Sequence, residues 1–170
     1  ESMDYLYNIR GWLRMINPLT EPDDLYVFEL QYNSSNGIFG TEPLYNGNIS
    51  VSAGASLVTP NTSGTIYGYT YDAMNRLVGA LDGTNDSRYS VSGITYDKNG
   101  NIKTLKRDGN VVANPTYSNN AHYGVMDDLT YTYEGNQLSI VSDAASVDQY
   151  GFKDDRVGSP VDNTIDYTYD

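Results

Sequence analysis

Short stretches in which aromatic or apolar residues alternate with polar ones dominate this sequence. Tyr, Thr, Val and Ile fill these stretches, and clusters of Gly, Asn, Asp and Ser interrupt them about every ten to fifteen residues. A period of two is typical of strands with one buried face. No window of about 11 residues keeps the i, i+3, i+4, i+7 spacing of an amphipathic helix, and the best helical candidate, residues 7–16, is interrupted by Gly11. The pattern predicts an all-β protein.

An internal repeat is the strongest sign of the architecture. Each repeat has an alternating strand ending in Tyr, then Asp or Asn, a turn with Gly or Asn, and a closing Leu or Ile. Residues 69–77 align in this way with residues 94–102, and residues 129–138 match both with one residue fewer in the turn. A variant copy, a shortened copy and an opening fragment complete the set: residues 5–13, 44–49 and 167–170.

We name each repeat by the Tyr that precedes its Asp, Asn or Glu, at positions 7, 45, 71, 96, 133 and 169. These anchors are separated by 25 to 38 residues, so only the core of each repeat recurs. The motif positions in the five fuller repeats are Tyr7, Asn8, Gly11, Leu13, Tyr45, Asn46, Tyr71, Asp72, Leu77, Tyr96, Asp97, Gly100, Asn101, Ile102, Tyr133, Gly135, Asn136 and Leu138.

The repeat chemistry predicts a β-hairpin. Tyr-Thr-Tyr directs both rings to one face of a strand and Thr to the other. The following Asp or Asn can accept a backbone N–H in an Asx turn, and Gly or Asn supplies the positive φ of a tight connection. We therefore expect hairpins at residues 71–77 and 96–102, with loops of about four or five residues. Packed Tyr rings, each burying roughly 150–250 Å², would replace a scarce aliphatic core.

Composition narrows the possible partners. The chain has 170 residues, 17 of them Tyr, and 22 acidic against 10 basic residues give a net charge of −12. Such a charge disfavours nucleic acid and anionic membrane surfaces. No apolar run approaches the roughly 20 residues of a membrane span, and no signal peptide is visible. Cys is absent, which excludes disulfides and thiolate metal sites. We expect one domain over residues 1–170, with the polar stretches 50–65, 109–122 and 144–164 as long loops or additional strands.

The repeats at Tyr71 and Tyr96, with the stretches 7–13 and 44–50, resemble the YD (tyrosine–aspartate) repeats of Rhs-type proteins, teneurins and toxin-complex shell subunits, and those of large bacterial Rhs-like proteins in particular. The resemblance covers about residues 4–170. It implies an antiparallel meander of hairpins that forms a twisted, curved sheet, as part of a hollow shell that encloses a C-terminal toxin in some members. The Asp-Pro-x-Gly-Leu motif of the family's cleavage domain is missing, so self-cleavage is not implied.

The resemblance implies a structural role in a large protein that is secreted or lies on the cell surface. The chain stops inside a repeat, so we expect an excised segment whose partners are the remainder of its own longer chain and, through free sheet edges, other copies of itself. No cofactor and no enzymatic activity are expected. The alternative is a carbohydrate-binding or adhesion module in which exposed Tyr rings and Trp12 contact a cell-surface glycan.

Three patterns were weighed for other chemistry. Residues 97–101 place oxygen ligands as a calcium loop does, with Asp108 at the twelfth position, but Ile102 stands where that loop needs Gly, so a hairpin turn is favoured. The acid pairs at 23–24, 127–128 and 154–155 are interpreted as solvated or as pointing to opposite faces of a strand. His122 is the single His of the chain. A Ser–His–Asp hydrolase would have to use it, but the sequence contains no Gly-x-Ser-x-Gly nucleophile elbow.

Overall fold

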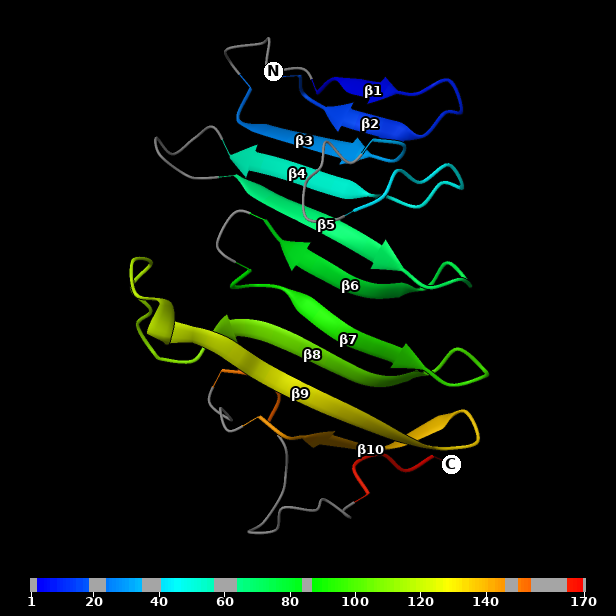
Figure 1. Cartoon of the computed structure of the whole chain (residues 1–170), viewed down its shortest axis with the longest axis vertical. Helices are drawn as coiled ribbons and strands as arrows, with labels where there is room; N and C mark the ends of the chain where they lie inside the picture. The colour runs from blue at the N-terminus through cyan, green and yellow to red at the C-terminus, as the bar shows by residue number, and fades with distance from the viewer. Residues whose placement is uncertain are drawn as a thin grey trace. The chain divides into compact units, whose positions relative to one another are not determined.

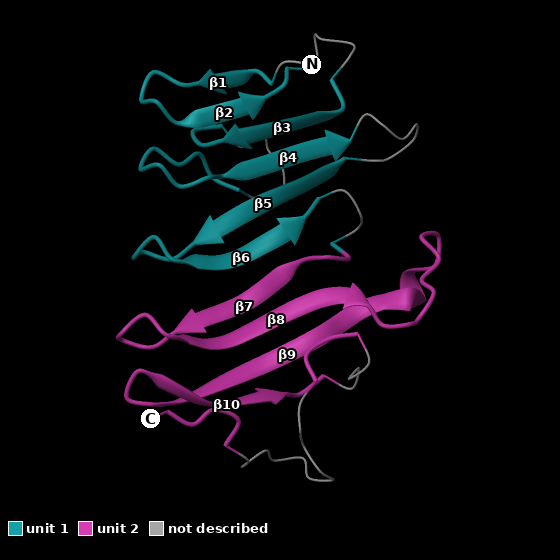
Figure 2. Cartoon of the chain, turned by 180° about the vertical axis from the view of Figure 1, so that it is seen from behind, with its two compact units in different colours: residues 1–87 teal, residues 88–170 magenta. Residues whose placement is uncertain are grey.

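The structure is a computed structural model that describes residues 3–18, 24–34, 41–56, 64–83, 87–145, 150–153 and 165–169. These residues form ten strands and one short 3₁₀ helix, with no α-helix among them, which confirms the predicted all-β class. The chain divides into two compact parts, an N-terminal lobe of residues 1–87 and a C-terminal lobe of residues 88–170 (units 1 and 2 in Figure 2).

The N-terminal lobe is an antiparallel meander of six strands, each paired with the next along the chain (Figure 1). Residues 7–16, the best helical candidate, lie instead in the first hairpin, because Gly11 adopts φ +78° in its turn. The strands are β1 (Tyr5–Tyr7), β2 (Leu13–Ile16), β3 (Tyr26–Gln31), β4 (Val51–Ser56), β5 (Thr65–Tyr71) and β6 (Leu77–Asp82).

The C-terminal lobe contains two hairpins, and their inner strands β8 and β9 also pair antiparallel. A loop with the 3₁₀ helix η2 (Asn120–His122) joins these two strands. The meander predicted from the repeats is thus confirmed within each lobe. The strands are β7 (Val91–Tyr96), β8 (Ile102–Asn110), β9 (Tyr123–Glu134) and β10 (Gln137–Asp143).

Tyrosine alternates with threonine as expected but does not form the fully buried core. In β5, Tyr69 and Tyr71 are half-buried and Thr70 is exposed. In β9, Tyr131 and Tyr133 repeat this pattern around an exposed Thr. The buried apolar side chains among the described residues are smaller and aliphatic: Val51, Ala80, Ile94, Leu129, Val141 and Ala145. The Tyr rings therefore remain half-buried on the sheet, and the fully buried apolar side chains are few and aliphatic.

Acidic side chains rank among the most completely buried groups of the described chain, which the sequence did not suggest. Asp127 on β9 is 1% exposed; its Oδ2 accepts from Arg107 Nε at 2.5 Å and its Oδ1 from the backbone N–H of Phe152 at 2.6 Å. The neighbouring Asp128 is half-buried and pairs with Lys106 at 3.0 Å. Adjacent acids thus take different sides of the strand, which confirms the interpretation for this pair and makes both structural.

Candidate functional site

Three turns of the repeats have the same hydrogen-bond geometry. The loops at residues 8–12, 72–76 and 97–101 each begin with Asn or Asp. The side-chain Oδ1 of that first residue accepts the backbone N–H groups of the third and fifth residues at 2.8–3.0 Å. Its backbone N–H donates to the carbonyl of the fifth residue at 2.9 Å. The fourth residue has positive φ in every loop, at Gly11 (+78°), Asn75 (+60°) and Gly100 (+90°).

The anchor Tyr is paired with the closing Leu or Ile at the turn end of each hairpin. Tyr7 pairs with Leu13, Tyr71 with Leu77, Tyr96 with Ile102, and Tyr133 with Leu138. A register shift accompanies the pair in all four hairpins. The expected hairpins at 71–77 and 96–102 are therefore confirmed, each with five residues between its strands.

The second carboxylate oxygen of each Asp also has a partner inside the turn. Oδ2 of Asp72 accepts from Nε and Nη2 of Arg76, both at 2.7 Å, and Oδ2 of Asp97 accepts from Nδ2 of Asn101 at 2.9 Å. The backbone and side-chain N–H groups of Arg76 lower the pKa of Asp72. The Asn101 amide, followed by backbone N–H groups, lowers that of Asp97. Residues 97–101 thus form the favoured hairpin turn.

The other repeats depart from this turn. In the Tyr133 repeat only Gly135 and Asn136 separate the strands, with Gly135 at φ +62°. Among the described residues before Tyr45, 41–44 form no strand; they belong to the connection between β3 and β4, in which Asn46 Oδ1 accepts the N–H of Asn48 at 3.1 Å. The shortened repeat therefore forms a turn without a hairpin.

Residues 165–169, which include the described part of the last repeat's opening fragment, lie along β10 without forming a strand. The backbone N–H of Asp166 donates to the Ser139 carbonyl at 2.9 Å, and its Oδ2 accepts from the N–H of Val141 at 2.6 Å. Tyr167 and Tyr169 are exposed. They are close enough for their phenols to raise the pKa of Tyr131 and Tyr133 respectively, although burial is the larger cause for both.

Tyrosine hydroxyls connect successive repeats. Tyr71 Oη donates to the carbonyl of Ile49, the closing residue of the preceding repeat, at 2.9 Å. Tyr133 Oη donates to the carbonyl of Ile102, again the closing residue of the preceding repeat, at 2.9 Å. Tyr32, outside the motif, donates to the carbonyl of Leu13 at 2.8 Å. We call this contact the phenol–carbonyl link; at Tyr71 and Tyr133 it gives the hydroxyl a role that Phe could not fill.

Asparagine side chains also join the turns of successive repeats, but here the earlier repeat donates and the later repeat accepts. Asn75 Oδ1 accepts from Nδ2 of Asn46 at 2.6 Å and from Nδ2 of Asn48 at 3.3 Å. In the C-terminal lobe, Asn136 Oδ1 accepts in the same way from Asn99 at 2.8 Å and from Asn101 at 3.1 Å. One Asn of each later repeat thus bridges two amides of the repeat before it. We call this contact the asparagine bridge.

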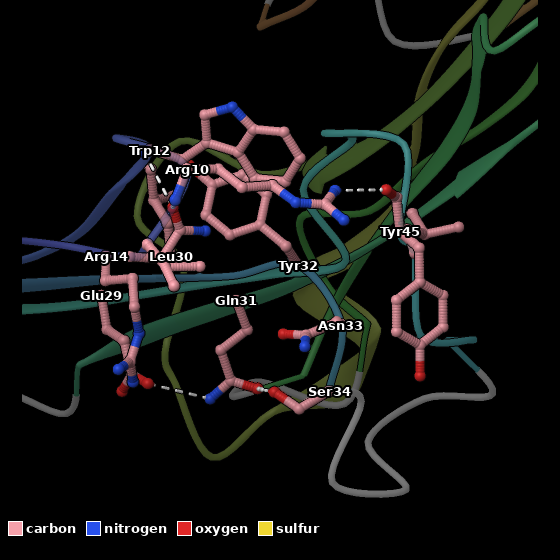
Figure 3. A pocket seen from close by; sticks show the side chains of 13 residues that line it. Arg10, Trp12, Arg14, Glu29, Leu30, Gln31, Tyr32, Asn33, Ser34 and Tyr45 are labelled. Carbon is pink, nitrogen blue, oxygen red and sulfur yellow. Dashed lines mark hydrogen bonds between the residues drawn. The ribbon is translucent and has the colours of Figure 1, made fainter.

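A pocket of about 390 Å³ lies where the Tyr7 and Tyr45 turns meet (Figure 3). Trp12 packs against Tyr32, with ring centroids 5.1 Å apart, and lies close to Gly47, where a Cβ would come within 3.2 Å of the Trp12 ring. The Arg10 guanidinium lies 5.2 Å from the Trp12 ring centroid and donates to the Tyr45 carbonyl at 2.8 Å. Trp12 thus packs between two turns and is only half-buried.

The remaining ring of the pocket is open to solvent. Tyr45 is 67% exposed and stands at the pocket rim, apart from Trp12 in Figure 3. Arg14, which is also exposed, lines the pocket beside Glu29. Arg14 makes no hydrogen bond or ion pair with any residue that the structure describes. The pocket therefore offers one cation and one aromatic face to a ligand, while the proposed sugar contact, Trp12, is largely occupied by its neighbours.

The other candidates for chemistry serve local structure. His122 ends η2, where its Nδ1 accepts the N–H of Thr116 at 2.9 Å and its Nε2 lies 2.8 Å from the amide of Asn119. Asp24 is buried, so the interpretation of these acids as solvated is wrong for this residue; residues 23 and 154–155 lie outside the described residues. Within the described ranges, no three His, Cys, Asp or Glu side chains gather closely enough to hold a metal ion.

Comparison with known proteins adds no family to this geometry. No protein-family model matches the chain, and no curated protein matches it significantly. In the part of the chain that the structure describes, no helix is long and apolar enough to cross a bilayer.

Proposed function

We propose that this chain is a structural segment of YD-repeat sheet, whose task is to build the wall of a β-shell or stalk in a large secreted or cell-surface protein of the Rhs type. In the full-length protein such a wall could enclose a C-terminal toxin. The role is mechanical and non-enzymatic, and it depends on each repeat being held to the next.

The coupling of successive repeats is the observation that carries this proposal. The phenol–carbonyl link and the asparagine bridge occur together between the Tyr45 and Tyr71 repeats and again between the Tyr96 and Tyr133 repeats. The hydroxyls of Tyr71 and Tyr133 and the Oδ1 atoms of Asn75 and Asn136 bond to the preceding repeat rather than within their own turns. The same contacts recur between successive repeats of the chain, as a structure built from repeated units requires. This recurrence, rather than a cleft with convergent side chains, supports a structural role.

The test is removal of the hydroxyl groups alone. Tyr71→Phe and Tyr133→Phe keep the ring and lose the donor, so each leaves a carbonyl without its partner and is expected to lower the free energy of unfolding by about 1 kcal/mol. Tyr45→Phe is the matched control, because the Tyr45 ring is exposed, and it is expected to change stability by less than about 0.5 kcal/mol. Urea denaturation followed by Trp12 fluorescence and circular dichroism measures all three.

Equal free energies of unfolding for the three variants would show that the phenol–carbonyl links do not stabilise the fold. This result would remove the basis of the proposal. A second experiment addresses the larger context. Sequencing of the flanking coding region decides between container and stalk: a downstream toxin-like domain with Asp-Pro-x-Gly-Leu supports the container, and its absence supports a surface role.

Carbohydrate binding is a second candidate, favoured by the exposed Tyr45 ring at the rim of a pocket that Arg14 also lines, an exposed cation that pairs with no described residue. A ring face packs well on the C–H side of a sugar, and a guanidinium would suit a carboxylated one. A glycan array gives the test: hits that are lost in Tyr45→Ala and retained in Tyr5→Ala support a glycan site at this pocket. An array without hits would eliminate it.

A further inference from the structure

Two of the asparagines that donate in the asparagine bridges are followed by glycine. An Asn-Gly pair is prone to lose the side-chain amide, because glycine has no side chain to obstruct attack by its own backbone nitrogen. The sequence contains three such pairs, at residues 36–37, 46–47 and 99–100. The first lies outside the described residues. In the other two, Nδ2 of Asn46 donates to Asn75 Oδ1 at 2.6 Å, and Nδ2 of Asn99 donates to Asn136 Oδ1 at 2.8 Å.

The Asn99–Gly100 pair is open to this reaction. Both residues are exposed, and a Cβ at Gly100 would meet no atom within 4 Å. With the described residues, the side chain of Asn99 makes one hydrogen bond, through Nδ2, so its Cγ is held at one end only. The Gly100 N–H donates to the Asp97 carbonyl at 3.2 Å, a longer bond than the 2.9 Å between the Asp97 N–H and the Asn101 carbonyl. The attacking nitrogen is therefore weakly held.

Asp97 is placed to take the proton that Gly100 must lose. Oδ1 of Asp97 accepts the backbone N–H groups of Asn99 and Asn101, the residues on either side of Gly100, at 2.8 and 2.9 Å. The Asn101 side-chain amide is the largest cause of the lowered pKa of Asp97, and the Gly100 N–H is among the smaller ones. The carboxylate thus lies beside the attacking nitrogen, where it can act as a general base.

The Asn46–Gly47 pair offers a comparison within the same chain. The amide of Asn46 is held at both ends, because Oδ1 accepts the N–H of Asn48 at 3.1 Å while Nδ2 donates to Asn75. The Trp12 ring would lie 3.2 Å from a Cβ at Gly47, so it crowds the approach to this peptide bond. The residue two positions before Asn46 is not an acid. We therefore expect this pair to react more slowly than the other.

We propose that Asn99 is a deamidation site, and that its modification removes one of the two donors of the asparagine bridge to Asn136. The backbone nitrogen of Gly100 forms a bond to Cγ of Asn99 and gives up its proton, which Asp97 accepts and passes on. The Cγ–Nδ2 bond breaks, and the amide nitrogen leaves with that proton as ammonia. Water then opens the cyclic imide at either carbonyl, so the product is aspartate or isoaspartate.

The product no longer suits the bridge. A carboxylate oxygen replaces Nδ2 opposite Asn136 Oδ1, so a donor–acceptor contact of 2.8 Å becomes a contact between two acceptors. The Asn101 amide, at 3.1 Å, is the donor that remains. The new negative charge lies in the turn that already holds Asp97, in a chain with a net charge of −12. Deamidation therefore weakens the contact between the Tyr96 and Tyr133 repeats without breaking the chain.

Incubation of the full 170-residue chain at neutral pH, followed by peptide mapping with mass spectrometry, tests the site. The peptide that contains Asn99 is expected to gain the mass difference between an amide and an acid several times faster than the peptide that contains Asn46. It should also separate into aspartate and isoaspartate forms. Asn99→Gln is the matched control, because its longer side chain forms a cyclic imide much more slowly. Equal rates at Asn46 and Asn99 in the folded chain, or an unchanged Asn99, would overturn the proposal.

The variant Asp97→Asn tests the proton acceptor. Asn8 accepts the equivalent pair of backbone N–H groups in its own turn, so the substitution keeps the turn and removes the base. Deamidation of Asn99 is expected to become slower, with the rate at Asn46 unchanged. A purely structural role of Asp97 predicts the opposite sign, because a loosened turn lets the backbone nitrogen reach Cγ more often. Faster deamidation of Asn99 would therefore overturn the role of Asp97 as base.

The variant Asn99→Asp introduces the aspartate product directly and measures its effect on the asparagine bridge. The equilibrium constant of unfolding is expected to rise about fivefold, as for the loss of one ordinary hydrogen bond. In a chain that also carries Asn136→Ala, the same substitution should change this constant little, because the acceptor of the bridge is already absent. An equal effect in both chains would assign it to the added charge and would overturn the role of the bridge.

Discussion

Asp97 shows how one side chain organises a whole turn. Its carboxylate accepts hydrogen bonds from the backbone N–H groups of Asn99 and Asn101 and from the Asn101 amide, at 2.8–2.9 Å. All of these donors favour the ionised form, with the Asn101 amide the largest cause, so the pKa of Asp97 lies below its ordinary value. The naturally occurring Asn8 at the same place in its own turn shows that a neutral amide also supports the geometry.

The variant Asp97→Asn therefore separates the charge from the turn. A depressed folded pKa contributes stability above the unfolded value of about 3.9 and loses it as the pH falls through the folded value. We expect Asp97→Asn to be less stable than the wild type at pH 7, and the difference to shrink toward pH 3. Urea denaturation at the two pH values measures it, and a difference as large at pH 3 as at pH 7 would contradict the assignment.

At the scale of the hairpin, the fourth loop position decides whether the strands can turn. Gly100 has φ +90° and a Cβ there would meet no atom within 4 Å, so the cost of Gly100→Ala is one of backbone conformation alone. We expect a loss of about 1–2 kcal/mol in unfolding free energy. Gly100→Asn is expected to cost less, because Asn75 adopts φ +60° at the equivalent position.

Gly124→Ala is the matched control for this experiment. Gly124 lies within β9, outside the positive-φ region, and a Cβ there would make an ordinary contact of 3.8 Å with Val111. Its replacement is expected to be neutral or slightly stabilising. If Gly100→Ala and Gly124→Ala had the same unfolding free energy, positive φ would not be what holds the turn.

The hairpins could be predicted from the sequence because their determinants are local. An Asx acceptor, a residue with positive φ and a closing apolar residue all lie within seven positions, as at 71–77 and 96–102. The Tyr45 repeat shows the limit of this reasoning. Its turn is present, but the described residues directly before it, 41–44, form no strand and include Pro43, which has no N–H to donate to a ladder.

The links between repeats could not be predicted, because they depend on register between distant segments. Tyr71 reaches a carbonyl 22 residues away, and Tyr133 one 31 residues away. The irregular spacing of the anchors hides which residues will lie opposite each other. The same reason conceals the buried Asp127, whose partners Arg107 and Phe152 are 20 and 25 residues distant. A sequence pattern identifies the hairpins, whereas the contacts between them follow only from pairing.

For the molecule as a whole, the tyrosines make stability sensitive to alkali. Burial is the largest cause of a raised phenol pKa at five positions that include both lobes: Tyr32, Tyr67, Tyr71, Tyr131 and Tyr133. A folded pKa above the unfolded value of about 10 gives stability that is complete below that pH. This stability is lost as the pH rises through the folded value. Ionisation also removes the proton that the phenol–carbonyl links donate and adds charge to a chain that already carries −12.

We therefore expect two populations of phenols in a titration followed by absorbance at about 295 nm. The five phenols whose pKa is raised by burial should ionise at a higher pH than an ordinary Tyr side chain, together with loss of the β-sheet circular dichroism signal. The double variant Tyr71→Phe, Tyr133→Phe should reduce the late group and bring unfolding to lower pH, because two links are already absent. A different result would contradict this expectation: ionisation of all 17 tyrosines in one step with an unchanged circular dichroism signal. It would show that the phenol groups do not stabilise the contacts between repeats.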